Sequence, residues 1–439
     1  MKCRRGIPKV SSAIIKNVPV TFTFLFPNIV LAIAYILITL EKLPRVVIAL
    51  LGASVLILSK IITQEEAFHF IDFNVIFLLL GMMILVNILR ETGGIRYLAI
   101  WVAKKVNGSG VLLMIYFALL TAFLSAFLDN VTTVLLLGSV TCAIAKDLKI
   151  NPVPFLVSQV VASNVGGTAT LIGDPPNIMI GSAAKLDFNQ FIIHLAPVIL
   201  MILPVTILTL YLFYRKQLDI PKAAKNELDA MPLNGLITHK ALLVKAVIVI
   251  CGVVIAFFFH GVLGFEAGTI ALAGASVLLI FENKRHIWED VEWTTIFFFV
   301  GLFIIVGAVE KVGTIYYLSE LVFKLAKGSY DVTALSILWM SAFLSAFLDN
   351  IPYTATMIPL VKNLGTHFHD LNPLWWSLAL GACLGGNGTL IGASANIVVA
   401  DMANKLKYPI TFIEFLKVGM IVMVESIIIC HLYIWWRYL

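Results

Sequence analysis

Charge is what this sequence has least of. Only 13% of its 439 residues are Asp, Glu, Lys or Arg, whereas 60% are hydrophobic. A soluble protein would carry roughly a quarter charged residues. Runs such as 21–40, 73–89 and 411–436 hold too few charges for a water-facing surface. Each is long enough to cross about 30 Å of hydrocarbon as a helix, so the sequence predicts an all-α polytopic membrane protein.

Two further absences narrow the function. The five cysteines are scattered without a C-x-x-C pair, which disfavours a metal centre or a disulfide framework. His367 and His369 stand with Asp370 in one loop stretch, which is a weak basis for a metal site. The net charge of +6 requires no nucleic-acid partner, because Lys and Arg in loops set the orientation of a membrane protein. We therefore expect no cofactor, no resident metal, and the lipid bilayer as a partner.

What the sequence does contain is a long internal repeat. It reads TAFLSAFLDNV from Thr121 and SAFLSAFLDNI from Ser341, a shift of 220 residues. Within one residue, the same shift aligns GGTATLIGDPPN from Gly166 with GGNGTLIGASAN from Gly385. At a slightly different offset, IALLGASVLIL around Ala49 matches IALAGASVLLI. Duplication over most of a chain is a common plan for secondary transporters.

Both copies predict the same order of elements. Three spans are followed by an amphipathic stretch, two apolar arms joined at an Asp-Asn pair, a Gly-interrupted segment and a final span. The arms predict hairpins, and the Gly-interrupted segments predict broken helices. The hairpins are expected at 112–145 and 332–361, and the broken helices at 153–184 and 374–403.

These elements divide the chain into two transmembrane repeats, 1–214 and 241–439, joined by a polar linker at 215–240. About five net crossings in each repeat would place the second upside down relative to the first, which is the inverted-repeat condition. Lys and Arg are concentrated in loops on the linker side, so the linker is predicted to be cytoplasmic. The basic N-terminus favours the opposite orientation, through Lys2, Arg4, Arg5, Lys9 and Lys16. We expect a multi-pass protein of the cell (inner) membrane.

Asp129 and Asp349 are carboxylates placed within otherwise apolar stretches. A charge near the bilayer centre is expensive, and such residues usually face protein or water. One interpretation is that each only caps the helix that follows, a role Pro352 would support in the second copy. The other is that each caps the helix and also binds an ion. Duplication favours the second, because Ser could cap the same turn at a lower desolvation cost.

The Gly-rich segments place polar residues inside apolar spans. Glycine weakens a helix and lets the backbone open. Opened carbonyls can bind a cation, while the helix that restarts points N–H groups at an anion or a polar substrate. Close packing of small residues is the alternative, and it accounts for Gly166 and Gly167. It does not account for the asparagines of these segments, namely Asn164, Asn177, Asn387 and Asn396.

The copies differ where the first reads Gly173-Asp174-Pro175-Pro176-Asn177. The second reads Gly392-Ala393-Ser394-Ala395-Asn396 at this place. Asp174 before Pro175 predicts a helix cap, and Ser394 is then the expected cap in the second copy. The alternative is that Asp174 is a third carboxylate of the transport site. Glu425, in the last span, has no acidic counterpart, and it either carries a proton or pairs with a polar neighbour.

The paired LDN turns and paired GGxxTLIGxxxN segments resemble the ion transporter superfamily. Within it, the chain is most similar to the arsenite-permease and Na+/H+-antiporter-like branch, which includes the melanosomal P protein. The resemblance covers nearly the whole chain, and GACLGGNGTLIGASAN is especially similar to P-protein-type members. It implies two inverted repeats, two re-entrant hairpins and two unwound helices, a scaffold shared with dicarboxylate carriers. Relatives with this scaffold are often dimers, so a homodimer is expected.

In the dicarboxylate carriers, the hairpin tips carry a Ser-Asn-Thr motif that helps to bind Na+ and carboxylate. Here the tips keep Asn130 and Asn350 but place Asp129 and Asp349 before them. A carboxylate at that place suits Na+ or a proton and disfavours an anionic substrate. Arsenite is mostly a neutral acid at pH 7 and stays compatible with this site.

These observations predict a secondary active transporter that moves a small inorganic ion and is coupled to Na+ or H+. Arsenite or antimonite efflux and Na+/H+ exchange are the leading activities. Alternating access would operate on two facing sites near the membrane midplane, with possible Na+ contacts at the two Asp-Asn pairs. The expected ion- and substrate-binding residues lie at the hairpin tips and along the Gly-rich segments: Asp129, Asn130, Thr132, Asn164, Thr168, Thr170, Gly173, Asp174, Asn177, Asp349, Asn350, Thr354, Asn387, Thr389, Gly392, Ser394 and Asn396.

Three rival functions use the same residues. An anion channel would replace the carrier, and a Na+-coupled anion or dicarboxylate transporter would change the substrate. An intramembrane aspartyl protease would pair Asp129 with Asp174. Such proteases typically show G-x-G-D, whereas Leu171 stands where the first glycine is required. We therefore expect no enzymatic activity.

Overall fold

The computed structural model describes residues 21–40, 42–106, 108–219, 228, 230–282 and 285–439. Within these residues the chain is helical and contains no strand. The basic residues that favoured the opposite orientation, Lys2 to Lys16, lie outside them, as do Lys222, Lys225 and Lys284 of the linker-side charges.

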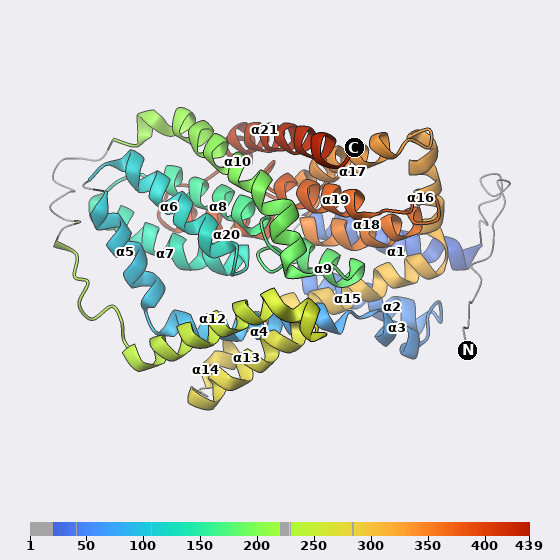
Figure 1. Ribbon diagram of the computed structural model, residues 1–439, viewed down its shortest axis with the longest axis horizontal. Coiled ribbons are helices and arrows are strands. Elements are labelled where there is room, and N and C mark those ends of the chain that lie inside the picture. The colour runs from blue at the N-terminus through green and yellow to red at the C-terminus, as the bar shows by residue number, and fades with distance from the viewer. Residues whose placement is uncertain (1–20, 41, 107, 220–227, 229, 283–284) are drawn as a thin grey trace.

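The described helices form two series, one on each side of the linker (Figure 1). Those of the first repeat are α1 (Phe22–Leu40), α2 (Arg45–Leu58), α3 (Gln64–Phe70), α4 (Phe73–Glu91), α5 (Gly94–Lys105), α6 (Gly110–Ser125), α7 (Asn130–Leu148), α8 (Val153–Gly167), α9 (Pro175–Ala184) and α10 (Phe188–Tyr214). Those after the linker are α12 (Lys240–Leu263), α13 (Ala267–Phe281), α14 (Arg285–Glu289), α15 (Trp293–Lys311), α16 (Thr314–Leu325), α17 (Tyr330–Phe347), α18 (Asn350–Leu364), α19 (Asn372–Gly385), α20 (Ser394–Lys405) and α21 (Phe412–Tyr438).

Hydropathy and length qualify many of these helices as membrane spans. In the described part of the chain, seven helical segments are long and apolar enough to cross a bilayer, and they contain α1, α4, α7, α10, α12, α15 and α17. Four shorter apolar helices accompany them, namely α2, α6, α8 and α13. The chain is therefore an integral, multi-pass membrane protein, as the scarcity of charge predicted.

The chain leaves the helical conformation where the sequence predicted a turn or a break. Helices α6 and α7 are separated by residues 126–129, and α17 and α18 by 348–349. We call these pairs hairpin 1 and hairpin 2. Helix α8 ends at Gly167 and α9 begins at Pro175, while α19 ends at Gly385 and α20 begins at Ser394. The breaks follow from glycine-rich sequence that is a poor helix former.

Two equivalent interfaces join the repeats, each between the second predicted span of one repeat and the third predicted span of the other. Helix α2 packs against α15, and α13 packs against α4. At these contacts, Gly301 lies against the backbone of Ala49, and Gly81 lies against the backbone of Ala271. Gly81 and Gly301 are equivalent in the repeat, as are Ala49 and Ala271, so the two interfaces use the same residues. Inversion of one repeat relative to the bilayer stays a prediction.

The hairpins and broken helices occupy the middle of the molecule. In Figure 1, α21 runs along the upper edge and α10 runs obliquely from that edge towards α9, while α12, α13 and α14 lie along the lower edge. Helices α7, α8, α18, α19 and α20 lie between the two edges. Hairpin 1 packs on α8 through α6, and hairpin 2 packs on α19 through α17. This arrangement brings the tips of both hairpins to the breaks in both broken helices.

Candidate functional site

The hairpin tips are capped by their aspartates. Asp129 Oδ1 accepts a hydrogen bond from the Thr132 amide at 2.9 Å, and Asp349 Oδ1 accepts one from the Ile351 amide at 3.0 Å. Each bond satisfies a donor in the first turn of a helix, α7 or α18, that has no partner within the helix. The predicted caps are confirmed. Because Oδ1 is the acceptor in both caps, the second oxygen of each carboxylate is left for another partner.

Two asparagines hold the unwound backbone in place. Asn177 and Asn396 lie near the starts of α9 and α20, are fully buried, and each donates two hydrogen bonds from Nδ2. The acceptors are carbonyl oxygens at 2.8 to 3.1 Å, those of Thr168, Thr170, Gly386 and Thr389. A buried carbonyl that has left a helix needs such a partner. These asparagines therefore support the backbone that the sequence predicted to line the site.

Hydroxyl groups tie the unwound segments to the hairpins. The Thr170 hydroxyl donates to the Ala126 carbonyl, and the Thr389 hydroxyl donates to the Ala346 carbonyl. Both acceptors lie close to a hairpin tip, in equivalent positions of the two copies. The tip and the break of each repeat are thus connected directly.

A cavity of about 320 Å³ lies between the hairpin tips and the first turns of α2 and α15. Five of the predicted site residues line it, namely Asp129, Asn130, Asp174, Asn350 and Ser394. Residues that the sequence analysis did not select also line it, among them Arg45, Glu292, Thr294 and Thr295. The cavity is therefore formed by elements of both repeats.

Asp174 lies at the centre of this arrangement and is fully buried. It precedes Pro175 at the start of α9, as predicted, but its side chain makes no capping hydrogen bond. Its Oδ1 instead accepts from Asn130 Nδ2 at 3.4 Å and from Asn350 Nδ2 at 3.3 Å. One carboxylate thus contacts the tips of both hairpins. The two predicted sites, each built within one repeat, are in this structure joined at Asp174.

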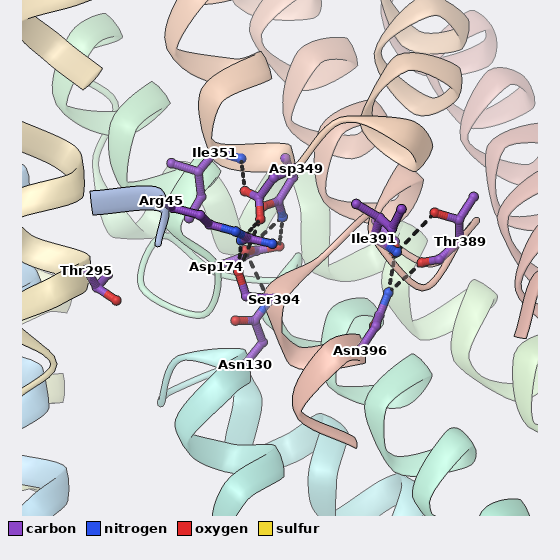
Figure 2. Close-up of polar contacts among 12 residues, drawn as sticks. Arg45, Asn130, Asp174, Thr295, Asp349, Ile351, Thr389, Ile391, Ser394 and Asn396 are labelled. Carbon is purple, nitrogen blue, oxygen red and sulfur yellow. Dashed lines mark hydrogen bonds and ion pairs between the residues drawn. The ribbon is translucent and has the colours of Figure 1, made fainter. Parts of the chain in front are cut away.

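Ser394 does not cap α20, so that prediction is wrong. The capping position is occupied by Ala393, and Ser394 is the first helical residue. The Ser394 hydroxyl instead accepts a hydrogen bond from Arg45 Nη1 at 2.7 Å and donates one to Asp349 Oδ2 at 3.1 Å. Arg45 Nη1 also forms an ion pair with Asp349 Oδ2 at 2.5 Å. Figure 2 shows these three side chains converging beside Asp174.

Buried amides join the two broken helices to each other. Asn164 Nδ2 donates to Asn387 Oδ1 at 2.9 Å and to Asn396 Oδ1 at 3.1 Å. Its own Oδ1 accepts from Asn130 at 3.3 Å. Cys383, which occupies the position equivalent to Asn164, donates to Asn177 Oδ1 at 3.4 Å. Each broken helix therefore contacts the asparagine that supports the other.

The lining of the cavity is acidic. Asp129, Asp174 and Glu292 contribute carboxylates, and in the part of the chain that the structure describes none of the three forms an ion pair. Glu292 Oε2 accepts a hydrogen bond from the Thr295 hydroxyl at 3.0 Å. Arg45 is the basic residue among those lining the cavity, and its guanidinium pairs with Asp349.

The repeat points to two of the residues that were not selected from the sequence, Cys383 and Glu292. Cys383 is the repeat equivalent of Asn164. Glu292 precedes α15 as Asp72 precedes α4, and Asp72 caps that helix. Arg45 carried no such signal, because a basic residue at the start of an apolar run predicts only orientation.

Other predicted residues lie away from the cavity lining. Thr132 contributes its backbone amide to the cap of α7, and the buried Thr354 hydroxyl has no hydrogen-bond partner among the described residues. Thr168 donates its hydroxyl to the Asn164 carbonyl at 2.7 Å. Gly173 and Gly392 pack closely against the backbone of Gly167 and Gly386 and so serve close packing of the unwound segments.

The remaining polar candidates are separate from the site. Glu425 Oε2 accepts a hydrogen bond from Thr209 at 2.7 Å, so it pairs with a polar neighbour on α10. His367 contacts Glu320 at 2.6 Å. Within the described residues, no group of three or more His, Cys, Asp or Glu side chains is arranged to hold a metal ion.

Comparison with known proteins gives one matching family. A family model described as "Citrate transporter" matches residues 35–381. An uncharacterised transporter of Mycobacterium tuberculosis (strain H37Rv) is 42% identical over 417 residues, which are 92% of this chain and 96% of that protein. The "46 kDa membrane protein" of Mycobacterium leprae is 39% identical over 93% of this chain and 98% of its own length. The P protein of Sus scrofa is 33% identical over 92% of this chain and 58% of its own length.

Proposed function

Because the chain belongs to the citrate transporter family, we propose that this membrane transporter is a secondary active carrier whose coupling cation, Na+ or H+, binds between the two hairpin tips. Its hairpins and broken helices would move against the other helices to expose the site to each side of the membrane in turn. The membrane is the cell (inner) membrane, with the linker on the cytoplasmic side, and the protein works as a homodimer.

The observation that carries the proposal is the environment of Asp174. This carboxylate is fully buried, accepts hydrogen bonds from Asn130 and Asn350, and has no ion-pair partner among the described residues. Burying a charged carboxylate without a counter-charge is costly. A bound cation or proton removes that cost. Asp129 and Glu292 line the same cavity and add to its attraction for cations.

The substrate has two candidate classes. The first is an inorganic solute: the acidic lining favours a cation, as in Na+/H+ exchange, and is compatible with a neutral inorganic acid such as arsenite or antimonite. The second class is a di- or tricarboxylate that enters together with cations, which the family description favours. Arg45 also favours this class, because its guanidinium lines the cavity and guanidinium groups bind carboxylates well. A free tricarboxylate without cations is disfavoured by repulsion from the acidic lining.

Reconstitution into liposomes tests this function. A pH-sensitive dye and radiolabelled substrates report flux while Na+, Li+, citrate, arsenite and chloride are varied. We expect Asp129→Asn and Asp174→Asn to lower cation-coupled flux by about tenfold or more, equivalent to a loss of at least about 1.4 kcal/mol in cation binding. Asp290→Asn is the matched control, since Asp290 pairs with Arg90 at the surface and does not line the cavity.

Three outcomes would contradict the proposal. Wild-type flux in folded Asp129→Asn and Asp174→Asn proteins would mean that the carboxylates only stabilise the fold. Flux far above carrier rates in single-channel recordings would identify a channel. Proteolytic activity that Asp174→Asn removes, with ion flux intact, would support the protease.

A further inference from the structure

The two halves of the site carry different charges although repeated sequence forms them. The first half contains Asp129 and Asp174, and Glu292 lines the cavity beside them. In the second half, Asp349 is retained, but Ala393 replaces the equivalent of Asp174. Only the second half contains an ion pair within the described residues, between Asp349 and Arg45.

Arg45 reaches Asp349 from a different element and a distant part of the sequence. It is the first residue of α2, and its side chain is 22% exposed, whereas the Asp349 side chain is 1% exposed. Ser394 bonds to both partners and closes a triangle of polar contacts. Figure 2 shows the guanidinium lying between α2 and the tip of hairpin 2. The second oxygen of Asp349, left over from the cap, is thus occupied by a cation that belongs to the protein.

The repeat supplies no equivalent cation for Asp129. The sequence RVVIALLGASVLIL of α2 aligns with AGTIALAGASVLLI of α13, which places Ala267 at the position of Arg45. The structure supports this alignment, because Ala49 and Ala271 make equivalent contacts with Gly301 and Gly81. Among the described residues, Asp129 therefore lacks the counter-charge that Asp349 has.

We propose that Arg45 is a built-in cation of the second half-site, which neutralises Asp349 and thereby limits the transporter to cation binding at the first half-site. The guanidinium stays charged at all relevant pH values, so Asp349 needs no mobile ion while the pair is formed. Arg45 then determines how many cations the protein carries in each cycle. This inference rests on the proposed cation coupling and adds the residue that sets its stoichiometry.

Removing the charge of Arg45 tests the inference. Arg45→Gln keeps a hydrogen-bond donor near Ser394 but leaves Asp349 without a counter-charge. Equilibrium binding of radioactive Na+ to the purified protein, together with proton uptake on binding, counts the cation sites. We expect one more cation per protein in Arg45→Gln than in the wild type. Citrate or arsenite flux against opposing Na+ or pH gradients should shift its reversal point by one additional cation per cycle.

Three further variants make the result specific. Arg45→Lys keeps the charge and should keep the wild-type stoichiometry. The double variant Arg45→Gln/Asp349→Asn removes both charges of the second half-site, leaves no carboxylate there, and should also bind the wild-type number of cations. If Arg45→Gln alone fails to fold, the double variant can still be measured, because removing both partners of a buried pair is tolerated better than removing one. Arg90→Gln changes a surface pair and should have no effect.

The outcomes separate this inference from the proposed function. An unchanged cation number in Arg45→Gln, or an altered one in the double variant, would overturn the role of Arg45. Loss of citrate flux in Arg45→Gln and also in the double variant, at an unchanged cation number, would show that Arg45 binds the substrate instead. Absence of any cation dependence in the wild type would contradict the proposed function itself.

Discussion

At the scale of single residues, polar side chains in this protein stabilise open backbone as well as lining the cavity. Asn177 and Asn396 are buried, and neither lines the cavity. Their amide groups hold carbonyl oxygens that have left a helix, such as those of Thr170 and Thr389. Asp174, in contrast, lines the cavity and does not cap its helix. Within one motif, Asn177 therefore stabilises the unwound backbone, whereas Asp174 lines the cavity.

Replacing a supporting asparagine should destabilise the protein. Among the described residues, Asn177→Ala leaves the buried carbonyls of Thr168 and Thr170 without partners, at about 1–3 kcal/mol for each. Asn396→Ala leaves only that of Gly386, because the Thr389 carbonyl also accepts from the Gly392 amide at 3.2 Å. We expect a lower melting temperature in detergent and loss of transport for both variants. Asn189→Ala is the control, because Asn189 donates to the Phe258 carbonyl in an exposed bond and should change little. Equal stability of Asn177→Ala and Asn189→Ala would contradict the supporting role.

At the scale of elements, each hairpin is fixed to a broken helix by close backbone contact. A Cβ atom added to Gly166 of α8 would overlap the Ala122 carbonyl of α6. A Cβ atom added to Gly385 of α19 would overlap the Ala342 carbonyl of α17 in the same way. The packing interpretation of these glycines is therefore correct alongside the predicted break. Hairpin and broken helix pack as one unit in each repeat.

A methyl group added at either glycine should push the hairpin and the broken helix of that repeat apart. Gly166→Ala and Gly385→Ala are expected to cost about 1–3 kcal/mol, typical of an overpacked site, and to lower coupled flux. Gly252→Ala is the control in α12, where an added Cβ meets no atom within 4 Å. It should leave stability unchanged or raise it by about 0.5–1 kcal/mol, since alanine favours a helix. Thermal unfolding and liposome flux measure both effects, and wild-type behaviour of Gly166→Ala would refute the tight contact.

At the scale of the whole molecule, equivalent regions of the two repeats have different surroundings. Near the start of α4, Asn74 donates to Ser182 of α9 at 3.2 Å and accepts from the Gly268 amide at 2.8 Å. The equivalent of Asn74 is Thr294, which lines the cavity at the start of α15. The equivalent of Ser182, Asp401, pairs with Lys405 instead. Asn74 and Ser182 line a separate cavity of about 430 Å³, and neither hairpin tip lines it. The hairpin tips instead line the cavity at the starts of α2 and α15, on the side predicted to bear the linker.

This asymmetry predicts one-sided access. In a background without the native cysteines, Thr295→Cys should react with a membrane-impermeant maleimide added on the linker side, because Thr295 lines the cavity. Val75→Cys is the matched control, since Val75 is the repeat equivalent of Thr295 and is fully buried. It should be protected from both sides. Labelling of Thr295→Cys only from the other side would reverse the predicted orientation, and its protection from both sides would exclude an open cavity.

The sequence by itself determined the features that depend on local composition. Scarce charge and long apolar runs predicted the membrane helices, and glycine-rich stretches predicted the breaks after Gly167 and Gly385. Asp129 and Asp349 were predicted as caps because a cap acts within one helical turn. These features involve residues near one another in the chain, so a sequence motif carries enough information for them.

Only the tertiary structure decided which polar groups meet. Arg45 pairs with Asp349 across 304 positions, and Asn164 bonds to Asn396 across 232. Asp174 lies between the tips of both hairpins, although the repeat suggested one site within each copy. The copies alone could not reveal these pairs, because the contacts cross from one repeat to the other and depend on how the helices pack. A carboxylate buried among amides and one neutralised by an arginine look alike in the sequence, and they differ only in the neighbours that folding provides.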